Sequence, residues 1–97
     1  MYASMVTLSP KEGQLEAAVA KYNNDLLPIL LAMPGIEKTY VFANPQMNVI
    51  RLLALWTSEA HATAPETRTT FQTVVQGLMP YLAVQPNREF FEIRYGD

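Results

Sequence analysis

The segment from residue 49 to residue 56 is apolar at almost every position, and it constrains the fold more than any other part of the chain. Its letters are VIRLLALW, so only Arg51 interrupts the apolar run. A strand with one wet face alternates apolar and polar residues, whereas a strand buried on both faces does not. The pattern therefore predicts a strand over 49–56 that is covered on both sides, with Trp56 at its end.

The chain has 97 residues, which suffices for one small core, and we expect a single domain over 1–97. Hydrophobic residues make up 49% of the sequence and charged residues only 16%. A small chain this apolar is expected to hide part of its surface against a partner. The formal net charge of −2 and the lack of any Lys/Arg cluster argue against a nucleic acid partner.

The sequence contains no cysteine, which excludes disulfides and thiolate metal sites. Residues 1–13 lack the positive start and the apolar core of a signal peptide. The longest apolar run, 26–33, contains a proline and is far shorter than the roughly 20 residues that a membrane span needs. We therefore expect a cytoplasmic protein with no membrane partner.

The first half of the chain reads as a strand followed by a helix. Residues 2–8 alternate as a strand does, and Ser9 then stands in the position of a helix N-cap, with a proline and a glutamate completing a capping box. An apolar stripe at helical spacing runs from there to Met33. Pro28 lies inside this stripe, so we expect it to kink or divide the helix. Gly35 follows the stripe and is expected to end the helix.

The second half of the chain predicts a hairpin, two helices and a last strand. Residues 36–43 alternate, and turn residues at 44–48 join them to the buried strand. A short helical turn begun by Thr57 or Ser58 is expected next. Thr63 is then read as the N-cap of a longer helix with an apolar stripe. Residues 88–95 predict the final strand.

The resulting order is strand, helix, strand, strand, helix, strand, the split βαβ pattern of ferredoxin-like domains. The predicted fold class is therefore α+β, with an antiparallel sheet and helices on one face. Two helices can cover only one face of a four-stranded sheet, yet the strand over 49–56 is apolar on both. We expect a second copy of the chain to cover the other face, which makes the protein a homodimer.

The chain resembles the antibiotic biosynthesis monooxygenase-like superfamily of dimeric α/β-barrel proteins. The resemblance is carried by the split βαβ order, by the MPGI join at 33–36 and by the LWTSEA run at 55–60. It implies a dimeric barrel and oxygenase chemistry without a cofactor, in a superfamily that also includes haem-degrading enzymes and signal-molecule isomerases. Relatives commonly carry a histidine where this chain has Pro65 and Glu66, and quinone-forming relatives carry an asparagine where it has Leu52. Haem degradation is therefore disfavoured.

Trp56 and His61 are the candidate catalytic residues. An indole at a strand end can wall a pocket and stack on a flat aromatic substrate, although a core tryptophan is the alternative. Histidine is the side chain type that titrates near neutrality, so His61 is the natural proton acceptor. The alternative for His61 is a surface histidine on a short helix.

Arg51, Tyr22 and Tyr40 are the candidate substrate-binding residues, together with Trp56. Arg51 breaks an apolar strand, so it either binds an anionic or carbonyl group of a ligand or pairs with Glu37 or Glu92 across the sheet. The two tyrosines either donate hydrogen bonds into a cavity or belong to the core.

The functional prediction is a small dimeric monooxygenase-like protein that needs no cofactor and acts on an apolar aromatic or quinol-type small molecule. Such chemistry asks for an apolar cavity, a proton acceptor and donors for a developing oxyanion. A non-catalytic small-molecule binding protein on the same fold is the alternative, since fold does not imply function. A purely partner-binding domain is the third possibility, should side chains fill the cavity.

Overall fold

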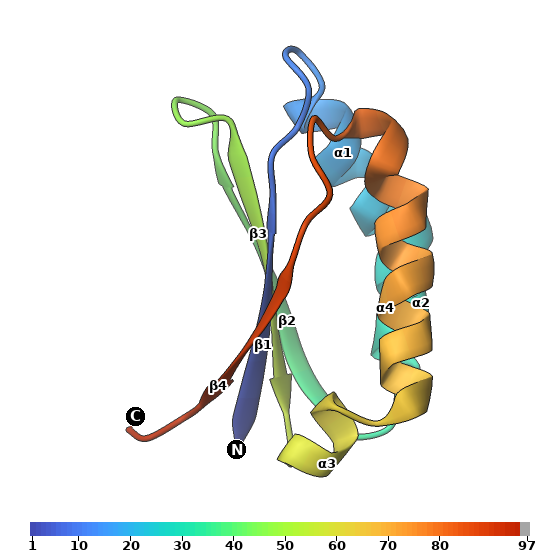
Figure 1. The fold of residues 1–97 in the computed structure, drawn as a ribbon, viewed down its shortest axis with the longest axis vertical. Coiled ribbons are helices and arrows are strands. Elements are labelled where there is room, and N and C mark those ends of the chain that lie inside the picture. The colour runs from blue at the N-terminus through green and yellow to red at the C-terminus, as the bar shows by residue number, and fades with distance from the viewer. Residues whose placement is uncertain (96–97) are drawn as a thin grey trace.

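Four antiparallel strands form one sheet in the order β2-β3-β1-β4, and the helices lie against one face of it (Figure 1). The structure is a computed structural model that describes residues 1–95. The elements in chain order are β1 (Tyr2–Leu8), α1 (Leu15–Lys21), the π-helix η1 (Tyr22–Leu26), α2 (Leu27–Leu31), β2 (Ile36–Asn44), β3 (Val49–Trp56), α3 (Glu59–Ala62), α4 (Pro65–Leu78), the 3-10 helix η2 (Met79–Tyr81) and β4 (Arg88–Glu92). The predicted α+β, ferredoxin-like fold class is confirmed.

Strand β3 is central and pairs with β1 on one side and β2 on the other. The side chains of alternate residues from Ile50 to Trp56 point toward the helices and are buried, with Trp56 fully enclosed. The intervening apolar side chains, Val49, Leu53 and Leu55, lie on the opposite face and are half-buried, while Arg51 is exposed. A single chain therefore covers only the side of β3 that faces the helices, although the sequence predicted a strand covered on both sides.

The first helical stretch is divided, as predicted. The chain changes from α1 to the π-helix η1 and back to α2, and Pro28 stands in the first turn of α2. Proline has no N–H to give to the preceding turn, and local π geometry absorbs this loss.

The predicted N-cap at Ser9 is wrong, because α1 begins at Leu15 with Gln14 in the cap position. The backbone around Ser9 is used differently. Pro10 bridges to Leu82, Lys11 N donates to Tyr81 O at 2.8 Å, and Ala83 N donates to Ser9 O at 2.8 Å. The chain there continues in extended pairing, so Ser9 has no free helix N–H to cap.

The N-cap at Thr63 is also wrong, whereas the one at Ser58 is confirmed. Ser58 Oγ accepts the backbone N–H of His61 at 3.3 Å and caps α3. Thr63 instead ends α3 and donates its hydroxyl to Glu59 O at 2.9 Å. Helix α4 starts at Pro65 without a side-chain cap.

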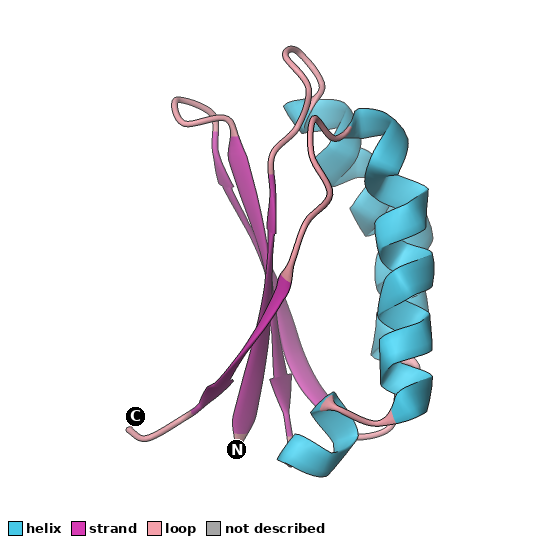
Figure 2. Ribbon diagram, viewed as in Figure 1, coloured by secondary structure: helices cyan, strands magenta, loops and turns pink. Residues whose placement is uncertain are grey.

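The sheet face away from the helices stays open in the single chain (Figure 2). Its exposed aromatic side chains are Tyr40 and Phe42, whose rings stack 6.0 Å apart, and Phe91, which is 46% exposed. This side, made of the outward residues of all four strands, is the open face of the sheet. Within residues 1–95, no helix has the length and apolarity to cross a membrane.

Candidate ligand pocket

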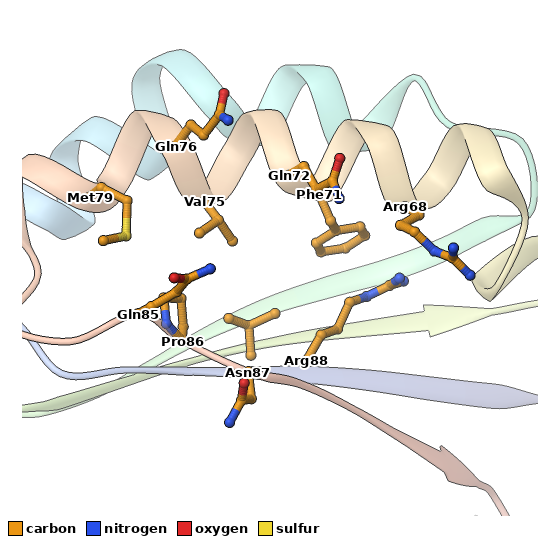
Figure 3. A pocket seen from close by; sticks show the side chains of 11 residues that line it. Arg68, Phe71, Gln72, Val75, Gln76, Met79, Gln85, Pro86, Asn87 and Arg88 are labelled. Carbon is orange, nitrogen blue, oxygen red and sulfur yellow. The ribbon is translucent and has the colours of Figure 1, made fainter.

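A pocket of about 590 Å³ lies between helix α4 and the strands β1 and β4 (Figure 3). This volume falls within the roughly 300–1,000 Å³ that small-molecule sites occupy. The lining residues are Val6 from β1, Arg68, Phe71, Gln72, Val75, Gln76 and Met79 from the helical side, and Gln85, Pro86, Asn87 and Arg88 from the segment that leads into β4. The pocket is therefore built by elements from both ends of the chain.

The wall that α4 supplies is apolar because of helical periodicity. Phe71, Val75 and Met79 follow one another at intervals of four residues and point from the helix toward the strands (Figure 3). The start of the helix is held by the buried Thr67, which donates its hydroxyl to His61 O at 2.7 Å. This wall gives a flat apolar molecule a surface to pack on.

Arg88 forms the opposite side of the pocket at one end. It pairs with Val6 in the sheet register, so its side chain leaves β4 on the helix-covered face. Its guanidinium carbon lies 3.9 Å from the ring centroid of Phe71 and 4.6 Å from that of Phe90. Its Nη2 donates to Ala62 O at 3.0 Å. Ring contacts and this hydrogen bond fix the charged group in place.

Among residues 1–95, no carboxylate forms an ion pair with Arg88. The ion pairs found within residues 1–95 join Lys21 to Asp25 and Arg94 to Glu92, away from this guanidinium. Its Nε is buried and makes no hydrogen bond. Burial lowers the pKa of Arg88 from 12.5 to about 10, so the group still carries its charge at neutral pH. A partly desolvated cation that has no anion paired with it is costly in free energy, and an anionic group of a ligand would reduce that cost.

Trp56 lies behind this pocket and does not line it. Its side chain is fully buried and its indole N–H donates to Ser4 Oγ at 3.0 Å. The indole packs 6.2 Å from the ring of Phe71, and the Arg88 guanidinium lies 5.9 Å from its centroid. Trp56 thus supports the two side chains that do line the pocket.

His61 lies outside the pocket, on α3. It is exposed, and its Nδ1 is 2.9 Å from Ser58 Oγ and 3.2 Å from Thr57 Oγ1. The imidazole also packs against Gly35, whose φ is +82°; a Cβ there would come within 2.6 Å of His61 Cβ. These contacts tie His61 to the join between the first helical stretch and β2.

The other three predicted site residues also lie outside the pocket. Tyr22 is buried in the core, and burial raises its pKa from 10 to about 12. Arg51 and Tyr40 lie on the open face. None of the five predicted residues lines the pocket, and the structure does not gather them into one site. Their catalytic and substrate-binding roles stay predictions.

Solved structures match the chain over nearly its whole length. A monooxygenase from the gene ActVA-Orf6 of Streptomyces coelicolor matches with a TM-score of 0.82 and 16% identity, over 99% of this chain and 89% of its own. A protein of unknown function from Nitrosomonas europaea matches with a TM-score of 0.77 and 23% identity, over 99% and 91%. An antibiotic biosynthesis monooxygenase matches with a TM-score of 0.69 and 11% identity, over 95% and 97%.

The chain has the fold of the antibiotic biosynthesis monooxygenase-like proteins. The resemblance noted in the sequence is thereby confirmed at the level of the fold. No protein-family model matches the sequence, and no curated protein matches it. The solved structures share too little sequence to carry residue roles over to this chain.

Within this antibiotic biosynthesis monooxygenase-like fold, sequence reasoning missed Arg68 and Arg88. The sequence feature that could have identified Arg88 is its position two residues before Phe90 in the last strand, which puts both side chains on the same face of the sheet. Phe91 on the other parity is equally apolar, so the sequence offers no choice of which face meets the helices. The signal for Arg68 was its place one turn before Phe71 on the helix. Both arginines needed the packing of α4 on the sheet to be recognised.

The described residues offer little for metal binding. Within residues 1–95 no three His, Cys, Asp or Glu side chains come together in a way that could hold a metal ion. The second hollow, of about 560 Å³, lies near the N-terminus of the chain and is lined by Met1, Tyr2, Ser58, Glu59, Glu92, Ile93 and Arg94. Most of these residues are exposed, so this hollow is a surface depression.

Proposed function

We propose that the protein is a small dimeric monooxygenase that acts, without a cofactor, on an apolar aromatic or quinol-type small molecule held beneath α4. The observation that carries the proposal is the uncompensated guanidinium of Arg88, fixed 3.9 Å from the Phe71 ring inside a pocket with one apolar wall. A flat ring would pack on that wall while a phenolic oxygen approached Arg88.

A fixed cation suits this chemistry because it favours the deprotonated phenol. The phenolate reacts with oxygen far more readily than the phenol, and its negative charge is stabilised by a nearby guanidinium in a low-dielectric site. For a phenol with hydrogen at the para carbon, the reaction with O₂ gives a quinone and water. One oxygen atom joins the ring carbon, and the other leaves as water with the ring and hydroxyl hydrogens. The substrate itself supplies the electrons.

The structural relatives support the proposal at the level of the fold. The Streptomyces coelicolor monooxygenase, whose structure holds the ligand nanaomycin D, aligns with 99% of this chain. A protein of the same fold therefore binds a small molecule. Its 16% identity leaves the substrate to be argued from this chain's own pocket.

The dimer is proposed on the apolar surface of the open face. Tyr40, Phe42 and Phe91 are each more than 40% exposed there, next to the half-buried Leu53 and Leu55. Exposed apolar surface of this kind is typical of a protein interface. An isologous contact between two copies would cover it.

A non-catalytic binding protein is the second candidate, and one observation favours it. The residues that line the pocket include no histidine, aspartate or glutamate. A phenol bound there would need water or a substrate group as its proton acceptor. The predicted acceptor, His61, would have to act from outside the pocket.

Oxygen uptake on a panel of hydroxylated polycyclic aromatics tests the proposal. We expect uptake by the unchanged protein, and Arg88→Gln should slow it by about 10²-fold, because the variant loses the group that stabilises the oxyanion. Arg51→Gln makes the same change of charge on the open face and should leave uptake nearly unchanged. This pair of variants also tests the sequence prediction that Arg51 binds the substrate.

The two candidate functions differ in one combination of results. Calorimetric binding of a panel member that is lost in Arg88→Gln, with no uptake by the unchanged protein, would reject the oxygenase and leave the binding protein. His61→Ala separates the predicted base from the pocket: a loss of uptake near 10²-fold with binding intact would assign it the role of proton acceptor.

A further inference from the structure

In the part of the chain that the structure describes, two positively charged side chains and no negatively charged one line the pocket. Arg68 and Arg88 are its only charged lining residues, and neither forms an ion pair within residues 1–95. The chain as a whole has a formal net charge of −2, so this concentration of positive charge is local. A neutral phenol would engage only one of the two cations.

The two arginines reach the pocket from opposite walls. Arg68 stands in the second turn of α4, one turn before Phe71, and Arg88 comes from β4. Figure 3 shows both guanidinium groups at the same end of the pocket, with the ring of Phe71 beside them. Val75 and Met79 lie toward the other end. The pocket therefore has a cationic end, and at its other end the apolar side chains of Val75 and Met79 face Gln85 and Pro86.

The two cations differ in how they are held. Arg88 is held by Ala62 O and by two aromatic rings, and its Nε is buried. Arg68 is exposed and makes no side-chain hydrogen bond within the described residues. A guanidinium held by several contacts suits the reacting oxygen, whose position matters, whereas the exposed guanidinium of Arg68 is free, within residues 1–95, of protein contacts that would compete with a second anionic group.

We infer that the ligand is a hydroxylated aromatic carboxylate, with its hydroxyl oxygen at Arg88, its carboxylate at Arg68 and its rings on the wall of Phe71, Val75 and Met79. This inference rests on the proposed function for the location of the reacting hydroxyl. A carboxylate is a group that a guanidinium can bind with two parallel hydrogen bonds, and it is the one that a small aromatic ring commonly carries. Gln72, one turn along α4 from Arg68, also lines the pocket, and its amide can donate to a remaining oxygen lone pair of the carboxylate.

Calorimetry with two probes of nearly equal shape tests the assignment. The probes are 3-hydroxy-2-naphthoate and 3-hydroxy-2-naphthamide, which share the ring and the hydroxyl but differ in charge. We expect the acid to bind at least about tenfold more tightly than the amide, which corresponds to about 1.4 kcal/mol. This preference should weaken as salt rises, because Arg68 is exposed and its charge is screened.

Arg68→Gln should reduce the preference for the acid to about one- to twofold, with the affinity for the amide unchanged. Arg68→Lys keeps the charge and should retain most of the preference. Lys11→Gln removes an exposed positive charge outside the pocket lining; it is the control and should retain all of the preference. Equal affinity of the two probes for the unchanged protein, binding of neither probe, or a preference that survives Arg68→Gln would each overturn the inference.

The failure of this inference and the failure of the oxygenase proposal can be told apart. Oxygen uptake on neutral phenols together with equal affinity for the two probes would overturn the carboxylate and keep the oxygenase. A strong preference for the acid without any oxygen uptake would support the carboxylate and reject the oxygenase.

Discussion

Burial shifts the pKa values of Arg88 and Tyr22 in opposite directions, and both shifts have the same cause. A low-dielectric environment disfavours the charged form, so the pKa of Arg88 falls to about 10 and that of Tyr22 rises to about 12. Arg88 is charged at neutral pH, and the hydrogen bond to Ala62 O and the ring contacts offset only part of its desolvation cost, so a bound anion would stabilise it further. Tyr22 is neutral at that pH and simply fills the core between the helices and the sheet.

Tyr22 makes the stability of the protein depend on pH in the alkaline range. Below pH 10 the tyrosine holds its proton in both folded and unfolded chains. Between pH 10 and about 12 it ionises in the unfolded chain while it stays protonated in the folded one, so the contribution of Tyr22 to the free energy of unfolding falls as pH rises, while the lowered pKa of Arg88 contributes in the opposite direction. Tyr22→Phe should remove about 1–2 kcal/mol of that fall, as measured by urea unfolding below and within this window. Tyr40→Phe, which removes an exposed hydroxyl, should keep the decline seen in the unchanged protein.

At the scale of elements, the path of the backbone decides where a helix starts, and a capping motif in the sequence does not do so by itself. Two Ser/Thr-x-x-Glu patterns stand near helices, yet neither Ser9 nor Thr63 caps one. Ser9 is held in extended pairing with the segment after η2, and Thr63 ends the preceding short helix. Ser58, by contrast, is extended and has a free helix N–H within reach. A capping motif acts only where the backbone leaves such a group unpaired.

Alanine substitutions distinguish the real cap from the two apparent ones. Ser58→Ala should lower the free energy of unfolding by about 1 kcal/mol, because it leaves the His61 N–H without its acceptor. Ser9→Ala and Thr63→Ala should each change it by less than about 0.5 kcal/mol. Midpoints of urea titration at neutral pH provide the comparison. A larger loss for Ser9→Ala than for Ser58→Ala would show that the first helix begins earlier in solution.

At the scale of the whole molecule, the open face is the feature that bears on whether the chain is a monomer or a dimer. The helices bury one side of the sheet, and the outward side chains of the four strands leave aromatic and aliphatic surface uncovered. Polar Lys38, Arg51 and Glu89 alternate with that surface. An interface of this mixed kind fits a contact between two folded subunits better than a core that forms only on association.

We expect light scattering after gel filtration to give about twice the chain mass of 10.9 kDa at micromolar concentration. Leu53→Glu places a charge at the centre of the open face and should yield a folded monomer. Leu31→Glu is the matched control, since Leu31 is 54% exposed on α2, on the helical side, and its substitution should leave the mass doubled. A folded monomer for the unchanged chain at that concentration would rule out the dimer.

Local patterns were enough to predict the order of elements, because hydrophobic period, proline and glycine act over a few residues. The buried strand 49–56, the divided first helix and the hairpin all followed from such patterns, and with them the fold class. The pocket did not, because its contacts join distant parts of the chain. Arg88 Nη2 lies 3.5 Å from Ser4 Oγ, although the two residues are 84 positions apart in the sequence. The same nitrogen donates to the carbonyl oxygen of Ala62, 26 positions away. Only the packing of α4 on one face of the sheet turned this arginine inward and placed Trp56 behind it.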